Sequence, residues 1–240
     1  MALGHLVLQS EPYADFFREM KARGDYVLVD NGSFEGRPLK TSELLEAAER
    51  IGADEIVLPD VPGFMMSTMI AIQNALIDIP VGCPFRKMAV PQGETQRMWI
   101  ECYKAIYETT SIEVIGIGAN AESLFADKGG RMAIVYALNT LSMQREETEY
   151  HLLGCREDPR ALQLYSKLPW IRSMDSQVPV LAGSQGVRFP IEGESQWQRP
   201  SGCIDYLSTE TFGKNDNVVD FNVGQFIRWS GGSNGEATRC

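Results

Sequence analysis

Three aspartates in this chain directly follow short apolar runs. Asp30 lies in YVLVDNGSFEG, Asp60 in EIVLPDVPG and Asp175 in WIRSMDSQVP. A carboxylate at the end of an apolar strand, next to a turn, is held in place by the fold and is still open to a ligand. Such carboxylates are typical of active sites, where they act as nucleophiles, acids, bases or hydrogen-bond acceptors.

Two further segments have the same form. KMAVPQG places Gln92 after an apolar run, and EVIGIGAN places Gly116 and Gly118 in one. Asp30, Asp60, Gln92 and Gly116 are separated by 30, 32 and 24 residues, about the length of one strand-helix unit. In a parallel sheet this spacing brings them to the same end of neighbouring strands. We therefore predict one site built from several strand ends.

The elements that position these residues alternate along the chain. The strand-like runs are 5–9, 26–30, 55–59, 87–91, 113–117, 150–154 and 170–174. Helical patterns cover 10–24, 41–52, 93–110, 129–143, 157–168 and 217–229. This alternation predicts an α/β fold, and the length favours a TIM-type (β/α)8 barrel. The eighth strand is expected from either 178–183 or 203–208, and the pattern does not decide between them.

Composition favours one globular domain. The chain has 240 residues, of which 44% are hydrophobic and 22% charged. We expect a single domain over residues 1–229 and a flexible tail over 230–240. No apolar run is long enough to span a bilayer and the start does not resemble a signal peptide, so a soluble, cytoplasmic protein is expected.

Several other classes of protein lack their usual signals here. The five cysteines are scattered and form no CxxC pair, so neither a disulfide framework nor a zinc ribbon is indicated. The chain contains no P-loop, no HExxH, no GxSxG and no dinucleotide-binding glycine motif after a strand. A net charge of −10 disfavours non-specific binding to polyanions, although arginines near the site segments leave room for a local basic groove.

The motifs DNGSFEG, LPDVPG, VPQG, GIG, HLLG and SMDS occur in this order between residues 26 and 177. In this order and spacing they resemble the tRNA-guanine transglycosylase superfamily, which includes bacterial and bacteriophage relatives that insert 7-deazaguanines into DNA. The resemblance implies a (β/α)8 barrel that exchanges guanine for a 7-deazaguanine such as 7-cyano-7-deazaguanine. The exchange leaves the phosphodiester backbone intact.

The resemblance also implies roles for individual residues. Asp175 would be the nucleophile that forms a covalent sugar intermediate, and Asp30 an acid/base that orients the base. Asp60 would accept hydrogen bonds from guanine N1–H and the exocyclic amine, while Gln92 would donate to O6. The glycines would let main-chain amides approach the base, and Phe34 would stack on it. Phosphates flanking a flipped base would be held by arginines, namely Arg172, Arg188 and Arg199.

Two departures from the family narrow the expectation. The family's zinc motif after the nucleophile is absent, so no metal or other cofactor is expected. The chain also starts near the family's second strand, so the barrel is expected to be compact, with an irregular or missing first unit. Both departures favour DNA rather than tRNA as the substrate. A tRNA substrate and a non-catalytic base-binding partner subunit remain as alternatives.

Simpler interpretations apply to individual residues. Any one of the aspartates, taken alone, has a helix cap or a turn as an equally good explanation. His151 is expected to be a structural histidine, Trp99 a core residue and Cys155 a buried small side chain.

Overall fold

The computed structural model describes residues 1–140, 148–156, 159–191 and 215–231. The chain forms two compact units, Met1–His151 and Leu152–Cys240. Arg199 and the possible eighth strand at 203–208 lie outside the described residues, as does the tail from residue 232 onwards. Among the described residues, no helix has the length and apolarity needed to cross a membrane.

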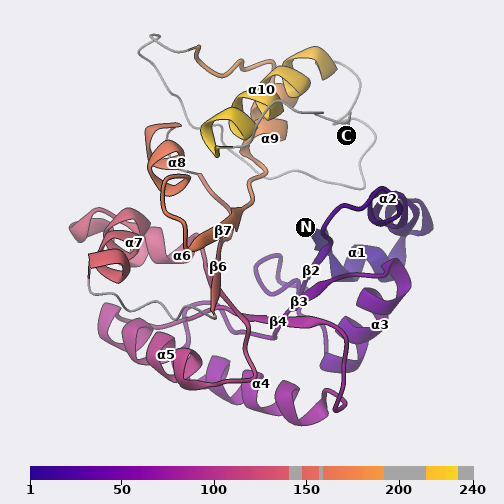
Figure 1. Cartoon of the computed structure of the whole chain (residues 1–240), viewed down its shortest axis with the longest axis vertical. Coiled ribbons are helices and arrows are strands. Elements are labelled where there is room, and N and C mark those ends of the chain that lie inside the picture. Colours follow the sequence, from indigo (N-terminus) through magenta and orange to yellow (C-terminus); the bar gives the residue numbers. More distant parts are fainter. Residues whose placement is uncertain (141–147, 157–158, 192–214, 232–240) are drawn as a thin grey trace. The chain divides into compact units, whose positions relative to one another are not determined.

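The chain has an α/β fold with one seven-stranded sheet whose strands follow sequence order, from β1 to β7 (Figure 1). Register pairs show that β1 to β5 run parallel to one another. This order is consistent with part of a (β/α)8 barrel, and no eighth strand occurs in the described parts of the chain. The strands are β1 (Ala2–Leu3), β2 (Leu28–Asp30), β3 (Glu55–Val57), β4 (Arg86–Ala89), β5 (Val114–Ile117), β6 (Glu149–Leu152) and β7 (Ile171–Met174).

Six of the seven predicted strands are confirmed, and the first is wrong. Residues 5–9 belong to helix α1 (Gly4–Gln9), while the first strand is the short β1 that precedes it. A five-residue apolar run does not distinguish a strand from a buried helical turn, and here Leu6 and Val7 pack inward from a helix. The first strand-helix repeat of the fold is therefore present, and it consists of a two-residue strand followed by two helices.

All six predicted helices are confirmed, but the pattern missed four of the helices in the described parts of the chain. One of these, α4 (Met65–Asp78), follows Phe64, which provides no side-chain cap. Ser10 and Thr95, by contrast, cap the predicted helices α2 and α5. Besides α1, the helices of the first unit are α2 (Glu11–Ala22), α3 (Thr41–Ile51), α4, α5 (Gln96–Glu108), α6 (Asn120–Leu124), a 3-10 turn at Ala126–Lys128 and α7 (Arg131–Thr140).

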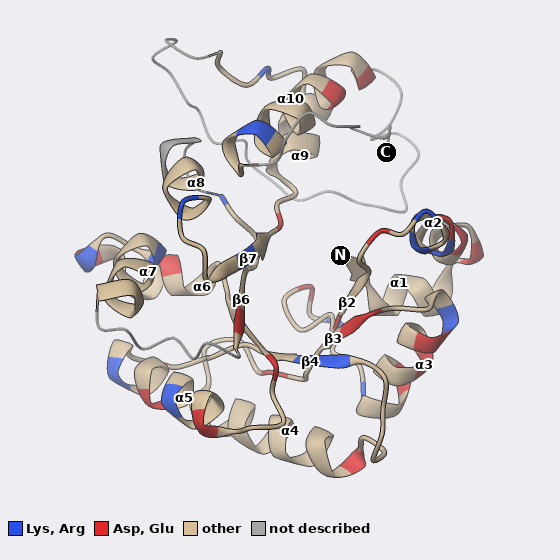
Figure 2. Cartoon of the chain, in the orientation of Figure 1, with Lys and Arg blue, Asp and Glu red and all other residues tan. Residues whose placement is uncertain are grey.

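Helices α3, α4 and α5 lie in succession along the outside of the strands of the first unit (Figure 1). The residues of β2, β3 and β5 are all buried, as expected for parallel strands covered by helices. Charged residues are frequent on α2, α3 and α5 but scarce on α4 (Figure 2). The strands thus form the core of this unit, and Asp30, Asp60 and Gln92 lie at or just beyond their carboxyl ends.

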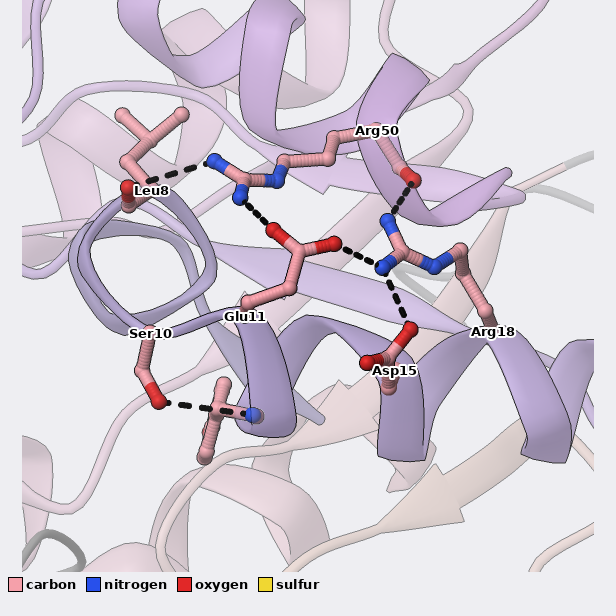
Figure 3. Close-up of polar contacts among 7 residues, drawn as sticks. Leu8, Ser10, Glu11, Asp15, Arg18 and Arg50 are labelled. Atoms are coloured by element: carbon pink, nitrogen blue, oxygen red, sulfur yellow. Dashed lines mark hydrogen bonds and ion pairs between the residues drawn. The ribbon is translucent and has the colours of Figure 1, made fainter.

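An exposed cluster of charges joins helix α2 to helix α3 within the unit Met1–His151 (Figure 3). Glu11 at the start of α2 accepts hydrogen bonds from both Arg18 and Arg50, and Arg50 also donates to the Leu8 carbonyl at 3.2 Å. These bonds to Arg18 and Arg50 lower the pKa of Glu11. Because the cluster is largely exposed, we assign it a role in orienting α2 against α3 and only a small share of the stability.

The second unit contains α8 (Pro159–Tyr165), α9 (Val178–Ser184) and α10 (Asp216–Trp229). The proposal of 178–183 as a closing strand is wrong, because this segment forms α9. Pro179 fits the first turn of a helix, where its missing N–H is not needed. A Cβ on Gly183 would lie 2.6 Å from the Cα of Val219, so the close contact of α9 with α10 requires glycine there.

Candidate functional site

Asp60 and Gln92 lie together just beyond the ends of the adjacent strands β3 and β4. Nε2 of Gln92 donates a hydrogen bond to Oδ2 of Asp60 at 2.5 Å. Both side chains are buried, with 9% and 3% of their residues' surfaces exposed. The register of β3 with β4 accounts for this pairing, since each residue follows its strand by three positions. The prediction that these two residues meet at one end of the sheet is confirmed.

Asn31, the residue after β2, holds the other oxygen of Asp60. Its Nδ2 donates to Oδ1 of Asp60 at 2.8 Å and to the Leu58 carbonyl at 2.7 Å. Its Oδ1 accepts from the Ser33 N–H at 2.7 Å, and Oγ of Ser33 donates to the Asp60 carbonyl at 2.9 Å. Because a main-chain N–H occupies Oδ1, the amide of Asn31 can present only its NH2 group to Asp60.

The amide of Gln92 is oriented in the same way. Its Oε1 accepts from the Gly63 N–H at 3.0 Å and from Nδ2 of Asn120. Its NH2 group must therefore face Asp60, and one of the two hydrogens on Nε2 remains after the bond to Asp60 is made. We call the four side chains of Asn31, Asp60, Gln92 and Asn120 the amide-carboxylate network.

The electrostatic state of Asp60 follows from this arrangement. Burial raises the pKa of Asp60, and the hydrogen bonds from Asn31, Gln92 and Ser33 oppose that rise. No ion pair among the described residues reaches Asp60. Asp60 is thus a buried acceptor satisfied by neutral donors, and a carboxylate has lone pairs left for further donors from a ligand.

Asp30, the last residue of β2, is buried beside this network. One of its oxygens, Oδ2, accepts from the Gly32 N–H at 3.0 Å. The neighbouring residue Asn31 contacts Asp60, so Asp30 lies one residue from a member of the network. Phe34, in the loop that follows, is 59% exposed.

The two glycines of GIGAN lie in and just after β5. Gly116 is a buried strand residue, and Gly118 packs closely against the network. A Cβ on Gly118 would lie 2.9 Å from Oδ1 of Asn120 and 3.4 Å from Cγ1 of Val90. This oxygen of Asn120 is buried and has no hydrogen-bond partner among the described residues. It is therefore an acceptor left over at the edge of the network.

Asp175 directly follows β7 in the second unit, as predicted. Its Oδ1 accepts from the Gly154 N–H at 2.9 Å, its own N–H donates to the Leu152 carbonyl at 3.1 Å, and its carbonyl accepts from the Cys155 N–H at 2.7 Å. Gly154, the glycine of HLLG, has a φ of 60°, a conformation that favours glycine. The Gly154 N–H therefore holds one carboxylate oxygen of Asp175, and Leu152 and Cys155 hold its backbone. The residue is only partly buried.

Two of the three arginines predicted to hold phosphates, Arg172 and Arg188, lie among the described residues. Nε of Arg172 donates to Oγ of Ser173 at 3.2 Å, while the guanidinium of Arg188 lies over the ring of Phe221, 3.8 Å from its centroid. A stacked guanidinium keeps its donors at the ring edge, so Arg188 can still bind an anion. Arg199 is not among the described residues, so its role stays a prediction.

The expectations for Trp99, His151 and Cys155 are consistent with the structure. Trp99 is buried in the core and stacks on Tyr103, with ring centroids 5.8 Å apart. His151 and Cys155 are buried as well. In the part of the chain that the structure describes, no cluster of three His, Cys, Asp or Glu side chains is arranged to hold a metal ion.

Sequence reasoning did not single out two members of the network, Asn31 and Asn120. Both lie inside segments that contain predicted site residues: Asn31 is the second residue of DNGSFEG, and Asn120 is the last residue of GIGAN. Asn31 precedes the turn glycine Gly32, and Asn120 begins helix α6, so a turn and a helix start already explain the two asparagines. Only the contacts with Asp60 and Gln92 identify them as members of the network.

No protein-family model matches the chain, and no curated protein matches its sequence, so the site is interpreted from its own geometry.

Proposed function

We propose that this protein is a guanine transglycosylase that exchanges guanine for a 7-deazaguanine in DNA. The observation that carries the proposal is the pairing of Asp60 with Gln92, in which a buried acceptor and an oriented NH2 group lie side by side. Guanine presents two donors, N1–H and the exocyclic amine, next to one acceptor, O6. A carboxylate beside an amide NH2 group is complementary to that edge.

The amide-carboxylate network supports this assignment over a purely structural role. Main-chain donors fix the orientation of both Asn31 and Gln92, so the polarity of the site is set before any ligand binds. A preorganised site that offers an acceptor and a donor in fixed order discriminates strongly between bases. Adenine, with an acceptor at N1 and a donor at C6, would place its groups against like groups. Guanine and 7-deazaguanine share the edge that is read, as an exchange requires.

The resemblance assigns the chemistry to Asp175. Its carboxylate oxygen would attack C1′ of the nucleotide while the bond from C1′ to N9 of guanine breaks, and Asp30 would give the leaving base its proton. The N9 nitrogen of the incoming 7-deazaguanine would then attack C1′, displace the Asp175 carboxylate and lose its proton to Asp30. Because the main chain around Gly154 fixes Asp175, little reorganisation of the nucleophile is needed. In duplex DNA the target nucleotide must first be flipped out, at a cost of a few kcal/mol.

The test is an exchange assay on the purified full chain. Duplex DNA carrying labelled guanine is incubated with 7-cyano-7-deazaguanine, with tRNA in a parallel reaction, and both nucleic acids are digested and analysed by nucleoside mass spectrometry. We expect labelled guanine to be released and a modified deoxynucleoside to appear. Modification of tRNA alone would assign the tRNA substrate. Exchange in neither would count against catalysis by this chain alone and favour the partner-subunit alternative.

A second readout addresses the nucleophile. We expect the wild-type protein and an Asp220→Ala control to form a covalent adduct with DNA that survives denaturation, and Asp175→Ala to form none. Asp220 is an exposed acid of the same unit with no predicted role of its own, so it controls for loss of a surface charge. Full exchange by Asp175→Ala would remove Asp175 from the mechanism.

A further inference from the structure

The loop between β2 and α3, residues 31–40, joins the amide-carboxylate network to the surface. Two main-chain bonds close the loop on itself: the Leu39 N–H donates to the Asn31 carbonyl at 3.0 Å, and the Arg37 N–H donates to the Gly32 carbonyl at 2.9 Å. Gly32 has a φ of 75°, and a Cβ there would lie 2.5 Å from the Arg37 carbonyl. The returning limb of the loop is therefore held against Asn31, a member of the network.

Two cations on this loop are exposed, Arg37 and Lys40, and neither forms an ion pair with a described residue. Most other described lysines and arginines of the unit Met1–His151 are paired with acids, namely Arg18, Lys21, Arg50, Arg86, Lys87, Arg97 and Lys128. A cation without an acidic partner keeps its attraction for an anionic ligand, whereas a paired one has lost much of it. Residues 31–40 hold one acid, Glu35, so the loop has a positive balance in an acidic chain.

The position of Arg37 separates it from the other exposed cations that form no described ion pair. Arg23 ends α2 and Lys104 lies within α5, so neither follows the carboxyl end of a strand. Arg37 does, and its charge reaches that edge of the sheet: burial first, and then the charge of Arg37, lower the pKa of His5. His5 lies two residues after Leu3, which ends β1 and pairs with the last residue of β2. The positive field of Arg37 therefore acts at the strand ends that carry the candidate site.

We propose that Arg37 and Lys40 bind the phosphodiester backbone of the DNA strand beside the nucleotide whose base Asp60 and Gln92 read, an inference that rests on the proposed function. A nucleotide within a strand has a phosphate on each side of its sugar, and arginine and lysine are the usual partners of such phosphates. A base that reaches Asp60 also lies beside the loop, because Asn31 belongs to both the loop and the network. The two cations would add contacts from the first unit to those expected of the three arginines of the second.

The test is the salt dependence of DNA binding by the full chain. Affinity for a guanine-containing duplex is measured by fluorescence anisotropy between about 50 and about 300 mM salt. The Asp175→Ala background is used so that no covalent adduct forms. Each phosphate contact contributes about −0.9 to the slope of log K against log salt. We expect Arg37→Gln and Lys40→Gln each to make the slope less negative by about one, and Arg37→Gln to weaken binding about tenfold at the lowest salt.

Two further variants separate the local effect from a general change of charge. Arg23→Gln removes another exposed cation of the same unit and should leave the slope unchanged. Arg37→Lys keeps the charge and should keep the slope. In the exchange assay, with Asp175 intact, Arg37→Gln should raise KM for DNA about tenfold and leave kcat and the KM for the incoming base unchanged. Circular dichroism checks that each variant is folded.

The outcomes distinguish this inference from the proposed function. Base exchange in DNA with an unchanged slope and KM in Arg37→Gln would overturn the inference and leave the function standing. A reduced slope in Arg37→Gln, together with no exchange by the wild type, would support the inference while the function failed. An effect confined to tRNA binding, an equal effect of Arg23→Gln, or no measurable affinity for DNA would each overturn the inference.

Discussion

The two ends of the strands in the first unit differ in how their acidic side chains are paired. At the amino ends, Nη1 of Arg86 pairs with Oε2 of Glu149 at 2.6 Å, and Nζ of Lys87 pairs with Oε1 of Glu113 at 3.0 Å. Glu55, which is fully buried there, accepts from the Tyr26 hydroxyl at 2.7 Å. At the carboxyl ends, the described partners of Asp60 are neutral: the amides of Asn31 and Gln92 and the hydroxyl of Ser33.

From this difference we interpret the amino ends of the strands as structural and the carboxyl ends as the candidate functional end. Oppositely charged side chains neutralise one another, so the amino ends have little affinity left for a charged or polar ligand. At the carboxyl ends Asp60 forms no ion pair with any residue that the structure describes, and burial raises its pKa. A perturbed acid without a charged partner is typical of a binding or catalytic site. In parallel α/β sheets such sites lie at the carboxyl ends of the strands.

The largest expected effect comes from removing the acid of the functional end. Asp60→Ala should lower kcat/KM for base exchange by about a thousandfold, or about 4 kcal/mol, because two donors of the base lose their acceptor. The free energy of unfolding should change much less, since the cost of burying the carboxylate disappears with it. Exchange kinetics and urea unfolding measure the two quantities. Asp25→Ala, an exposed acid of the same unit, is the control; near-normal kcat/KM in Asp60→Ala would exclude the base-reading role.

The second prediction concerns a cation at the amino ends of the strands, where stability rather than activity should change. Arg86→Met leaves Glu149 and the buried Glu55 without their nearby cation and should lower the free energy of unfolding by about 2 kcal/mol. Arg86 is one-third exposed, which keeps the loss below that of a fully buried pair. The rate of exchange per folded molecule should be unchanged. Urea unfolding and initial rates test this, and a variant that is stable but inactive would contradict the division between the two ends.

The support of Asp60 is tested by pH dependence. Asn31→Ala removes a donor that lowers the pKa of Asp60 while burial still raises it, so the pKa should rise further. Guanine needs the ionised acid, so kcat/KM should fall on the acid side at a higher pH than in the wild type. At neutral pH the loss should be about tenfold, or about 1.4 kcal/mol.

The same change has a defined sign for stability. The folded pKa of Asp60 lies above its unfolded value, so the free energy of unfolding falls as the pH rises from the unfolded to the folded pKa. Asn31→Ala should extend that fall to higher pH. Ser33→Ala, which keeps the amide of Asn31, should move the acid limb less. An acid limb that is identical in Asn31→Ala and in the wild type would show that Asp60 is not the titrating group.

The smallest effect is expected at the edge of the network. Gly118→Ala places a Cβ 2.9 Å from Oδ1 of Asn120, so the asparagine must shift and its bond to Gln92 weakens. We expect KM for the incoming base to rise about threefold, or about 0.7 kcal/mol, with kcat nearly unchanged. Gly224→Ala meets no neighbour within 4 Å and is the control. An unchanged KM would separate Asn120 from base binding.

Much of this fold was predictable because its signals are local. Apolar runs of four or five residues predicted six of the seven strands, and regular strand-helix spacing predicted that Asp60 and Gln92 would meet. The errors occurred where a short apolar run had two possible structures. Residues 5–9 and 178–183 both formed helices, because packing against other helices, rather than the residues' own preferences, selected the conformation.

The amino-acid sequence by itself determined which residue types stand at the strand ends, since alternation and spacing are properties of the chain. Only the tertiary structure decided what those residues do to one another. The NH2 groups of Asn31 and Gln92 face Asp60 because the N–H groups of Ser33 and Gly63 occupy their oxygens. Gly63 and Gln92 follow two different strands, β3 and β4, and are 29 residues apart in the sequence. No local pattern encodes the direction of a hydrogen bond between two such segments.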